Sequence, residues 1–261
     1  MAAMEAATQS QQLPQSSPRP FGPAQAWIIF FSYVGVQLAI GFAVGFAMAL
    51  GYAIRHHGKM EKLAEAMVGP VAAGALLGVI VAGVVAYGLA RRAARRDPYQ
   101  PSLALFGWTG STPQALLTAA LAGLALGAVY LGLFALFPPH EGKKLGLLAR
   151  SLSGGGWPLY AWALFAVAIA PPVEEFVFRG VMWAGLARSW RPGAAAFAIT
   201  AAFLLLHVTE AGGYPIALVA IGSLGLMALV ARVLTGSLVP AIAMHSSYNS
   251  VIVAAVLGGN A

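Results

Sequence analysis

The sequence predicts an all-α protein, a polytopic transmembrane helical bundle of about seven spans. Of its 261 residues, 59% are hydrophobic and only 9% are charged, with a mean hydropathy of +0.78, whereas soluble domains carry roughly 25% charged residues. The apolar residues form segments long enough to cross a bilayer. The net charge of +7 comes mainly from basic residues between these segments, which is typical of loops near anionic headgroups and argues against a nucleic-acid partner. The absence of cysteine excludes disulfides and thiolate chemistry.

The N-terminal half of the chain consists of a tail and three predicted spans. Residues 1–25 are rich in Gln, Ser and Pro and lack an apolar face, so we expect a disordered polar tail. The transmembrane domain should then occupy residues 26–258, beginning with a helix at about Ala26–Ile54. Further spans are expected at about Met67–Ala90 and Gln114–Phe137. The loop between these two spans carries the densest basic cluster and is therefore expected in the cytoplasm with the N-terminus; its members are Arg91, Arg92, Arg95 and Arg96.

Glycines spaced by four residues occur in each of the first three spans and favour close helix packing. The pairs are Gly41 with Gly45, Gly74 with Gly78, and Gly123 with Gly127.

The C-terminal half should contain four more elements, and residues 158–257 carry the functional motifs. A polar, Gly-rich stretch at 138–157 is expected to be a loop or interfacial helix. The fourth element, about Pro158–Trp190, contains Pro171 and Pro172, which predict a kinked or interrupted helix. The remaining spans are expected at about Gly193–Val208, Tyr214–Leu234 and Leu238–Leu257.

Two adjacent carboxylates and a guanidinium lie inside the fourth element, where charge is costly and usually marks a functional site. Glu175 and Arg179 are four residues apart, so on a helix they share a face and can form an ion pair. Glu174 lies about 100° away around the helix and has no basic partner on its face. We therefore assign Glu175 and Arg179 to structural support and Glu174 to chemistry.

Three more polar side chains lie in later spans. Glu174 precedes the turn between the fourth and fifth elements by about 16 residues and His207 follows it by about 15, so the two should lie at the same depth, about 24 Å from that turn. His245 and Asn249 share a face of the last span because they are four residues apart. We expect Glu174, His207, His245 and Asn249 to form one site.

Such a site supports amide hydrolysis in two ways. In the first, the carboxylate takes a proton from water, His207 orients that water or moves the proton, and His245 with Asn249 stabilises the oxyanion. In the second, Glu174, His207 and His245 coordinate zinc and leave one position open. Spacing alone does not separate the two.

Three motifs in this order resemble those of the CAAX prenyl endopeptidase and bacteriocin-processing (CPBP, or Abi) family of intramembrane proteases. They are Glu174-Glu175-x-x-x-Arg179, Phe203-x-x-x-His207 and His245-x-x-x-Asn249. The resemblance implies a glutamate-dependent protease in which Glu174 and His207 activate water, His245 and Asn249 bind the oxyanion, and no metal cofactor is favoured. Members of the family were first described as metalloproteases, so zinc stays open as an alternative.

The expected protein is therefore an intramembrane endopeptidase in a multi-pass integral membrane setting. Its partners would be a lipid-modified or membrane-embedded protein or peptide substrate and the surrounding membrane lipids. The preference for arginine over lysine and the abundance of alanine indicate a bacterial plasma membrane. The rival hypothesis is a non-enzymatic membrane protein, such as a scaffold, an immunity protein or a small-molecule transporter, that uses the same polar cluster as a binding site.

Overall fold

The computed structural model describes residues 20–57, 62–139 and 157–258, and in these ranges it is helical without strands. Six helices are long and apolar enough to cross a membrane, and a seventh apolar helix is shorter. The predicted polytopic bundle is confirmed. The expected loop at 138–157 lies almost entirely outside the described residues, as do residues 1–19 of the expected tail.

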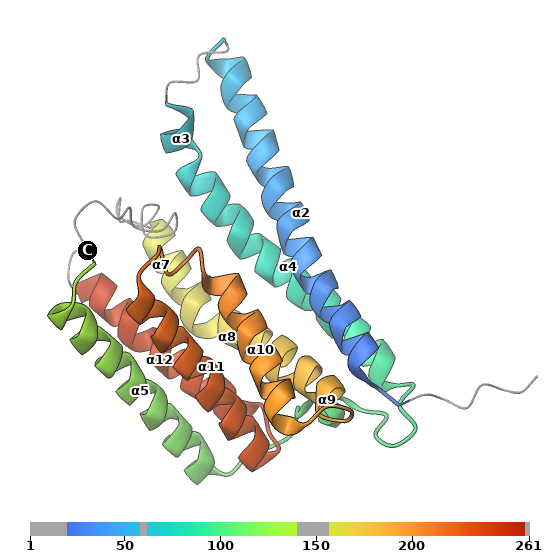
Figure 1. Ribbon diagram of the computed structural model, residues 1–261. Helices are drawn as coiled ribbons and strands as arrows, with labels where there is room; N and C mark the ends of the chain where they lie inside the picture. Colours follow the sequence, from blue (N-terminus) through green and yellow to red (C-terminus); the bar gives the residue numbers. More distant parts are fainter. Residues whose placement is uncertain (1–19, 58–61, 140–156, 259–261) are drawn as a thin grey trace, which may run out of the picture.

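The helices alternate in direction along the chain (Figure 1). Before the motifs come α2 (Pro23–Arg55), the short α3 (Leu63–Ala66), α4 (Val68–Ala94), a 3-10 turn η2 (Leu103–Phe106) and α5 (Pro113–Leu136). The fourth element comprises α7 (Trp157–Leu164), η3 (Phe165–Ile169), α8 (Ala170–Glu175), η4 (Phe176–Met182) and α9 (Trp183–Leu186). The last three helices are α10 (Pro192–His207), α11 (Pro215–Thr235) and α12 (Val239–Gly258).

Proline marks where most of these helices begin. Pro23, Pro113, Pro192 and Pro215 each stand at the first helical positions of their helices, where the missing N–H has no intrahelical partner to lose. At the opposite end, α11 stops at Gly236, whose φ of 67° is left-handed and is tolerated because glycine has no Cβ. The start of α2 at Pro23 brings residues 20–25 of the expected tail into the ordered structure, where Phe21 is buried.

The fourth element is one continuous helical rod, and its interruption is a change of hydrogen-bond pattern. The segments η3 and η4, on either side of α8, are π-helical. A π-helix bonds each N–H to the carbonyl five residues earlier. Pro171 and Pro172 have no N–H, so the carbonyls of η3 that they would bond receive no donor from the rod, but the helix does not end there. The proline pair therefore changes the hydrogen-bond pattern of the helix just before Glu174.

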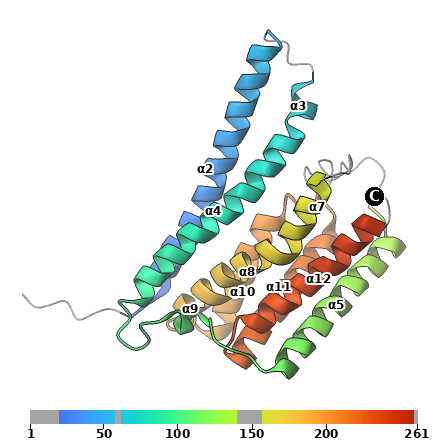
Figure 2. The same cartoon turned by 180° about the vertical axis from the view of Figure 1, so that it is seen from behind.

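This rod lies between a hairpin of α2 and α4 and a group formed by α5, α10, α11 and α12 (Figures 1 and 2). The helix α4 approaches closely because alanines recur every four residues on the face toward the core. They are Ala82, Ala86, Ala90 and Ala94, all essentially fully buried. Phe178 of the rod joins both sides, since its ring lies edge-to-face against Phe30 of α2 at 5.7 Å and against Phe203 of α10 at 5.1 Å.

The glycine pairs behave in two ways. A Cβ on Gly74 or Gly78 would touch Val44 or the backbone of Gln37 in α2, and a Cβ on Gly123 would meet the Met244 carbonyl oxygen of α12. These glycines hold helices close together, as the spacing predicted. Gly41 and Gly45 have no such neighbours in the described structure, although Gln37 and Val44 of the same stretch contact α4, so these two glycines do not lie at the helix contact.

An ion pair between the buried Asp97 and the partly exposed Arg188 lies at the end of the bundle where the described chain begins. Asp97 follows α4 and accepts hydrogen bonds from the Phe21 N–H at 2.8 Å and from Arg188, after α9, at 2.6 Å. Its other oxygen accepts from the N–H groups of Tyr99 and Gln100. Burial on its own would raise the pKa of Asp97, but these hydrogen bonds lower the pKa to about 2.

Candidate active site

The structural ion pair predicted between Glu175 and Arg179 of the first motif is present. The Arg179 guanidinium and the Glu175 carboxylate are 3.1 Å apart and both side chains are fully buried. Arg179 also donates to the Gly225 carbonyl of α11 at 2.7 Å and lies over the Phe203 ring at 4.4 Å. The guanidinium thus ties the rod to α10 and α11, and this arrangement explains how a cation can be accommodated inside the bundle.

Glu174 differs from its neighbour in facing the cavity, with a side chain that is 14% exposed where that of Glu175 is fully buried. Its Oε2 atom, like that of Glu175, is buried and has no hydrogen-bond partner. The Nε2 atom of His207 lies 3.7 Å from this oxygen and that of His245 lies 3.9 Å from it. These distances are too long for direct hydrogen bonds and short enough for one water molecule to bridge.

The ring orientations of both histidines follow from their second nitrogens. His207 Nδ1 lies 2.8 Å from the Phe203 carbonyl oxygen, one turn back in α10, so this nitrogen must be the donor. His245 Nδ1 lies 2.9 Å from Glu175 Oε1 and donates to that carboxylate. In each neutral ring Nε2 is therefore an acceptor that faces Glu174. The hydrogen bond between His245 and Glu175 was not predicted from the sequence.

Asn249 lines the site and also forms a hydrogen bond that connects α12 to the fourth element. Its amide donates to the Ala166 carbonyl oxygen at 2.7 Å. Ala166 lies in η3, where Ala170 N–H bonds to Phe165 O five residues back, so the matching donor for Ala166 would be residue 171. That residue is proline and has no N–H. Asn249 supplies the missing donor from α12, and its second amide hydrogen stays available.

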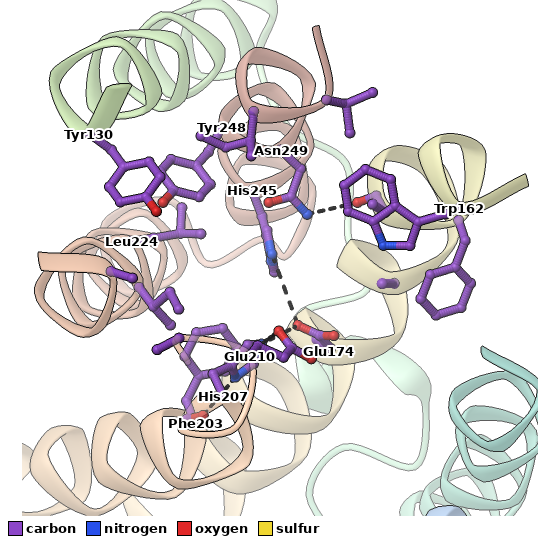
Figure 3. A pocket seen from close by; sticks show the side chains of 18 residues that line it. Tyr130, Trp162, Glu174, Phe203, His207, Glu210, Leu224, His245, Tyr248 and Asn249 are labelled. Atoms are coloured by element: carbon purple, nitrogen blue, oxygen red, sulfur yellow. Dashed lines mark hydrogen bonds and ion pairs between the residues drawn. The ribbon is translucent and has the colours of Figure 1, made fainter. Parts of the chain in front are cut away.

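One cavity of about 220 Å³ connects these groups (Figure 3). Glu174, His207, His245 and Asn249 all line it, as predicted, whereas Glu175 and Arg179 lie behind it. Most other lining side chains are apolar or aromatic, including Trp162, Phe165, Ile221, Leu224, Tyr130 and Tyr248. At roughly 30 Å³ per water, the cavity has room for several water molecules. The catalytic roles of the four residues stay predictions.

Glu210 is a lining residue that the sequence reasoning missed. Its Oε2 atom lies 3.9 Å from His207 Nε2, and its side chain is 57% exposed. The span was expected to end at Val208, and Glu210 was not considered as a site residue. The helix α10 ends at His207, and the turn that follows it is closed by a hydrogen bond from the Ala211 N–H to the His207 carbonyl at 3.0 Å. The spacing of three residues between His207 and Glu210 was the available signal.

The alternative zinc site does not find support in this arrangement. Within the ranges that the structure describes, no group of three His, Cys, Asp or Glu side chains is placed to hold a metal ion. Glu174, His207 and His245 come close without forming such a group. We derive no step through a metal.

Comparison with known families places the motifs in context. Residues 156–251 match the family model described as Rce1-like, type II CAAX prenyl endopeptidase Rce1-like. The matched segment begins just before α7 and ends two residues after Asn249, so it contains all three motifs. No curated protein and no solved structure matches the chain.

Proposed function

Because residues 156–251 belong to the Rce1-like family of type II CAAX prenyl endopeptidases, we propose that this chain hydrolyses a peptide bond of a lipid-modified or membrane-embedded substrate with water activated by Glu174. The observation that carries the proposal is the buried, unpartnered Oε2 of Glu174, which lies within 4 Å of Nε2 of two histidines in one cavity. Because this oxygen forms no hydrogen bond within the protein, it is available to accept a proton from water.

The proposed first step is attack of water on the scissile carbonyl. Glu174 accepts one proton of a water held between its Oε2 and His207 Nε2, and the hydroxide oxygen bonds to the carbonyl carbon. When the carbon–nitrogen bond breaks, that proton passes to the leaving amine, directly or through His207 Nε2. The hydroxyl remains with the new carboxyl group, so one water is consumed for each bond that is cleaved.

The oxyanion formed in this step needs hydrogen-bond donors. The second amide hydrogen of Asn249 is one, since the first is committed to Ala166. His245 Nε2 can donate only when the ring is an imidazolium, because Nδ1 already donates to Glu175. We propose that Glu175 serves the reaction indirectly by orienting His245.

The test is cleavage by the purified protein in lipid vesicles, with a panel of prenylated and transmembrane peptides read out by mass spectrometry. Wild type should cleave at least one peptide, and Glu174→Gln should lower kcat by roughly 10²- to 10⁴-fold, as expected for loss of a general base. Ser250→Ala is the matched control, because its hydroxyl bonds to the Ser246 carbonyl and does not line the cavity, and it should cleave like wild type.

Two results would contradict the proposal. Equal cleavage by wild type and Glu174→Gln would remove Glu174 from the mechanism. Failure of wild type to cleave any peptide would instead favour the non-enzymatic alternative. Treatment with a strong chelator is a separate arm: loss of activity that zinc restores would support a metal mechanism against the one derived above.

A further inference from the structure

The mouth of the cavity carries a carboxylate that the proposed mechanism does not use. Glu210 follows His207 by three residues in the turn after α10, and its Oε2 atom lies 3.9 Å from His207 Nε2, so both side chains project to the same side. Glu210 lines the cavity together with Glu174 and is 57% exposed, whereas Glu174 is 14% exposed. Glu174 is therefore the inner acid and Glu210 the outer one; the two lie side by side near His207 (Figure 3).

The charge balance around the cavity is negative toward its opening. Its lining contains two carboxylates and no Lys or Arg. In the described part of the chain the ionic contact of Glu210 is with His207, at 3.9 Å, and no Lys or Arg side chain pairs with it. Arg179 is committed to Glu175 behind the cavity. A substrate entering at Glu210 therefore meets a carboxylate at the edge of apolar walls.

We propose that Glu210 is a specificity-determining residue, which selects substrates with a Lys or Arg side chain close to the scissile bond and disfavours an acidic side chain there. This inference rests on the proposed function. The two distances that link Glu210 to Glu174 through His207 are 3.9 and 3.7 Å. An extended peptide advances about 3.3 Å per residue, so the cation falls within about two residues of the bond attacked at Glu174.

The experiment uses the peptide that wild type cleaves in the panel, resynthesised with lysine, norleucine or glutamate at each of the positions flanking the scissile bond. Lysine and norleucine have similar chains and differ in charge. At one position we expect wild type to prefer lysine over norleucine by roughly fivefold in kcat/KM, the upper end for a half-exposed ion pair, and to cleave the glutamate peptide least. Glu210→Gln should bring the lysine-to-norleucine ratio to about one.

Thr209→Gln is the matched control, since Thr209 is the exposed neighbour of Glu210 and does not line the cavity; it should keep the wild-type ratio. Moving the acid by one residue, in Thr209→Glu/Glu210→Thr, should abolish the preference while preserving the charge of the loop. An unchanged lysine preference in Glu210→Gln, or the absence of any preference in wild type, would overturn the inference and leave the proposed function standing.

A binding measurement tests the role of Glu210 in specificity separately from the proposed cleavage activity. In a Glu174→Gln background, binding of the lysine and norleucine peptides is compared by fluorescence with and without Glu210→Gln. Tighter binding of the lysine peptide that depends on Glu210 supports the inference independently of turnover. Equal binding of both peptides in the presence of Glu210 contradicts it, even if cleavage itself is lost with Glu174.

Discussion

Arg179 is the residue on which the geometry of the three motifs depends. It contacts the first motif through Glu175, the second through the ring of Phe203, and α11 through the Gly225 carbonyl. Glu175 in turn holds His245 of the third motif. One buried network thus fixes the relative positions of α8, α10 and α12. It also explains why the second motif contains Phe203, whose ring packs against the Arg179 guanidinium.

Removing the charge of Glu175 should therefore destabilise the fold. In Glu175→Gln the Arg179 guanidinium is left buried without its counter-ion, and we expect a loss of roughly 3–5 kcal/mol in the free energy of unfolding. Glu174→Gln is the control, because Glu174 Oε2 has no partner to lose, and its stability should match wild type. Thermal unfolding in detergent measures both. Equal melting temperatures for the two variants would contradict the division of roles.

The sequence was sufficient to separate the two adjacent acids, because the i, i+4 spacing of Glu175 and Arg179 survives in the structure. It also placed Glu174 and His207 at one depth from their distances to a shared turn. It could not predict that His245 donates to Glu175, since the rotation of α12 about its axis depends on packing against α5 and α11. Glu210 was missed because it lies beyond the end of the apolar span, in the turn after α10.

At the scale of elements, the proline pair removes a hydrogen-bond donor from the rod, and α12 supplies a replacement. Pro171 leaves the Ala166 carbonyl without a donor within the rod, and Asn249 of α12 provides one. We expect Asn249→Ala to destabilise the protein by about 1–3 kcal/mol, the cost of an unsatisfied buried carbonyl. In a Pro171→Ala background, where residue 171 regains an N–H, the same substitution should cost less. A double-mutant cycle measures the coupling, and zero coupling would disprove the link.

The crossing of α5 and α12 offers a second test at this scale. A Cβ on Gly123 would overlap the Met244 carbonyl oxygen, while Gly132 on the same helix has nothing within 4 Å. Gly123→Ala should destabilise the bundle by about 1–3 kcal/mol through overpacking. Gly132→Ala should be neutral or slightly stabilising, since alanine favours helix over glycine by up to about 1 kcal/mol. Similar melting temperatures for the two variants would contradict the observed helix approach.

The positions of all seven apolar segments were predictable to within a few residues because each is bounded by proline, glycine or basic residues. The helix α10 has 16 residues, as expected for Gly193–Val208, and is shorter than the other spans. After it the chain turns at Gly212 and Gly213, which both have positive φ. The turn brings residues 210 and 211 to the cavity, and no hydropathy pattern encodes that.

At the scale of the whole molecule, Asp97 joins three distant parts of the chain outside the spans. It holds Phe21 at the start of α2 and Arg188 after the rod. Because its pKa is about 2 in the folded protein against an unfolded value near 3.9, its contribution is present above about pH 4 and is lost as pH falls toward 2. The full contribution should be about 2 kcal/mol.

Asp97→Asn provides the measurement. The difference in stability between wild type and this variant, followed by denaturant unfolding in detergent, should be largest above about pH 4 and should shrink as pH falls toward 2. Other carboxylates titrate equally in both proteins and cancel in the difference. A difference that stays constant from pH 6 to pH 2 would show that Asp97 is not the group responsible.

The hairpin of α2 and α4 has a consequence for how the protein responds to its lipid surroundings. At 1.5 Å per residue, the 33 residues of α2 rise about 50 Å, well beyond the roughly 30 Å of a hydrocarbon layer. Phe42 and Ile54 in its far half are largely exposed, and so long an apolar helix adapts to a bilayer by tilting, kinking or thickening the lipid around it. Gly83 of α4 packs closely against Val173, the residue before Glu174. A change in the tilt of the hairpin would therefore reach a contact one residue away from the proposed base.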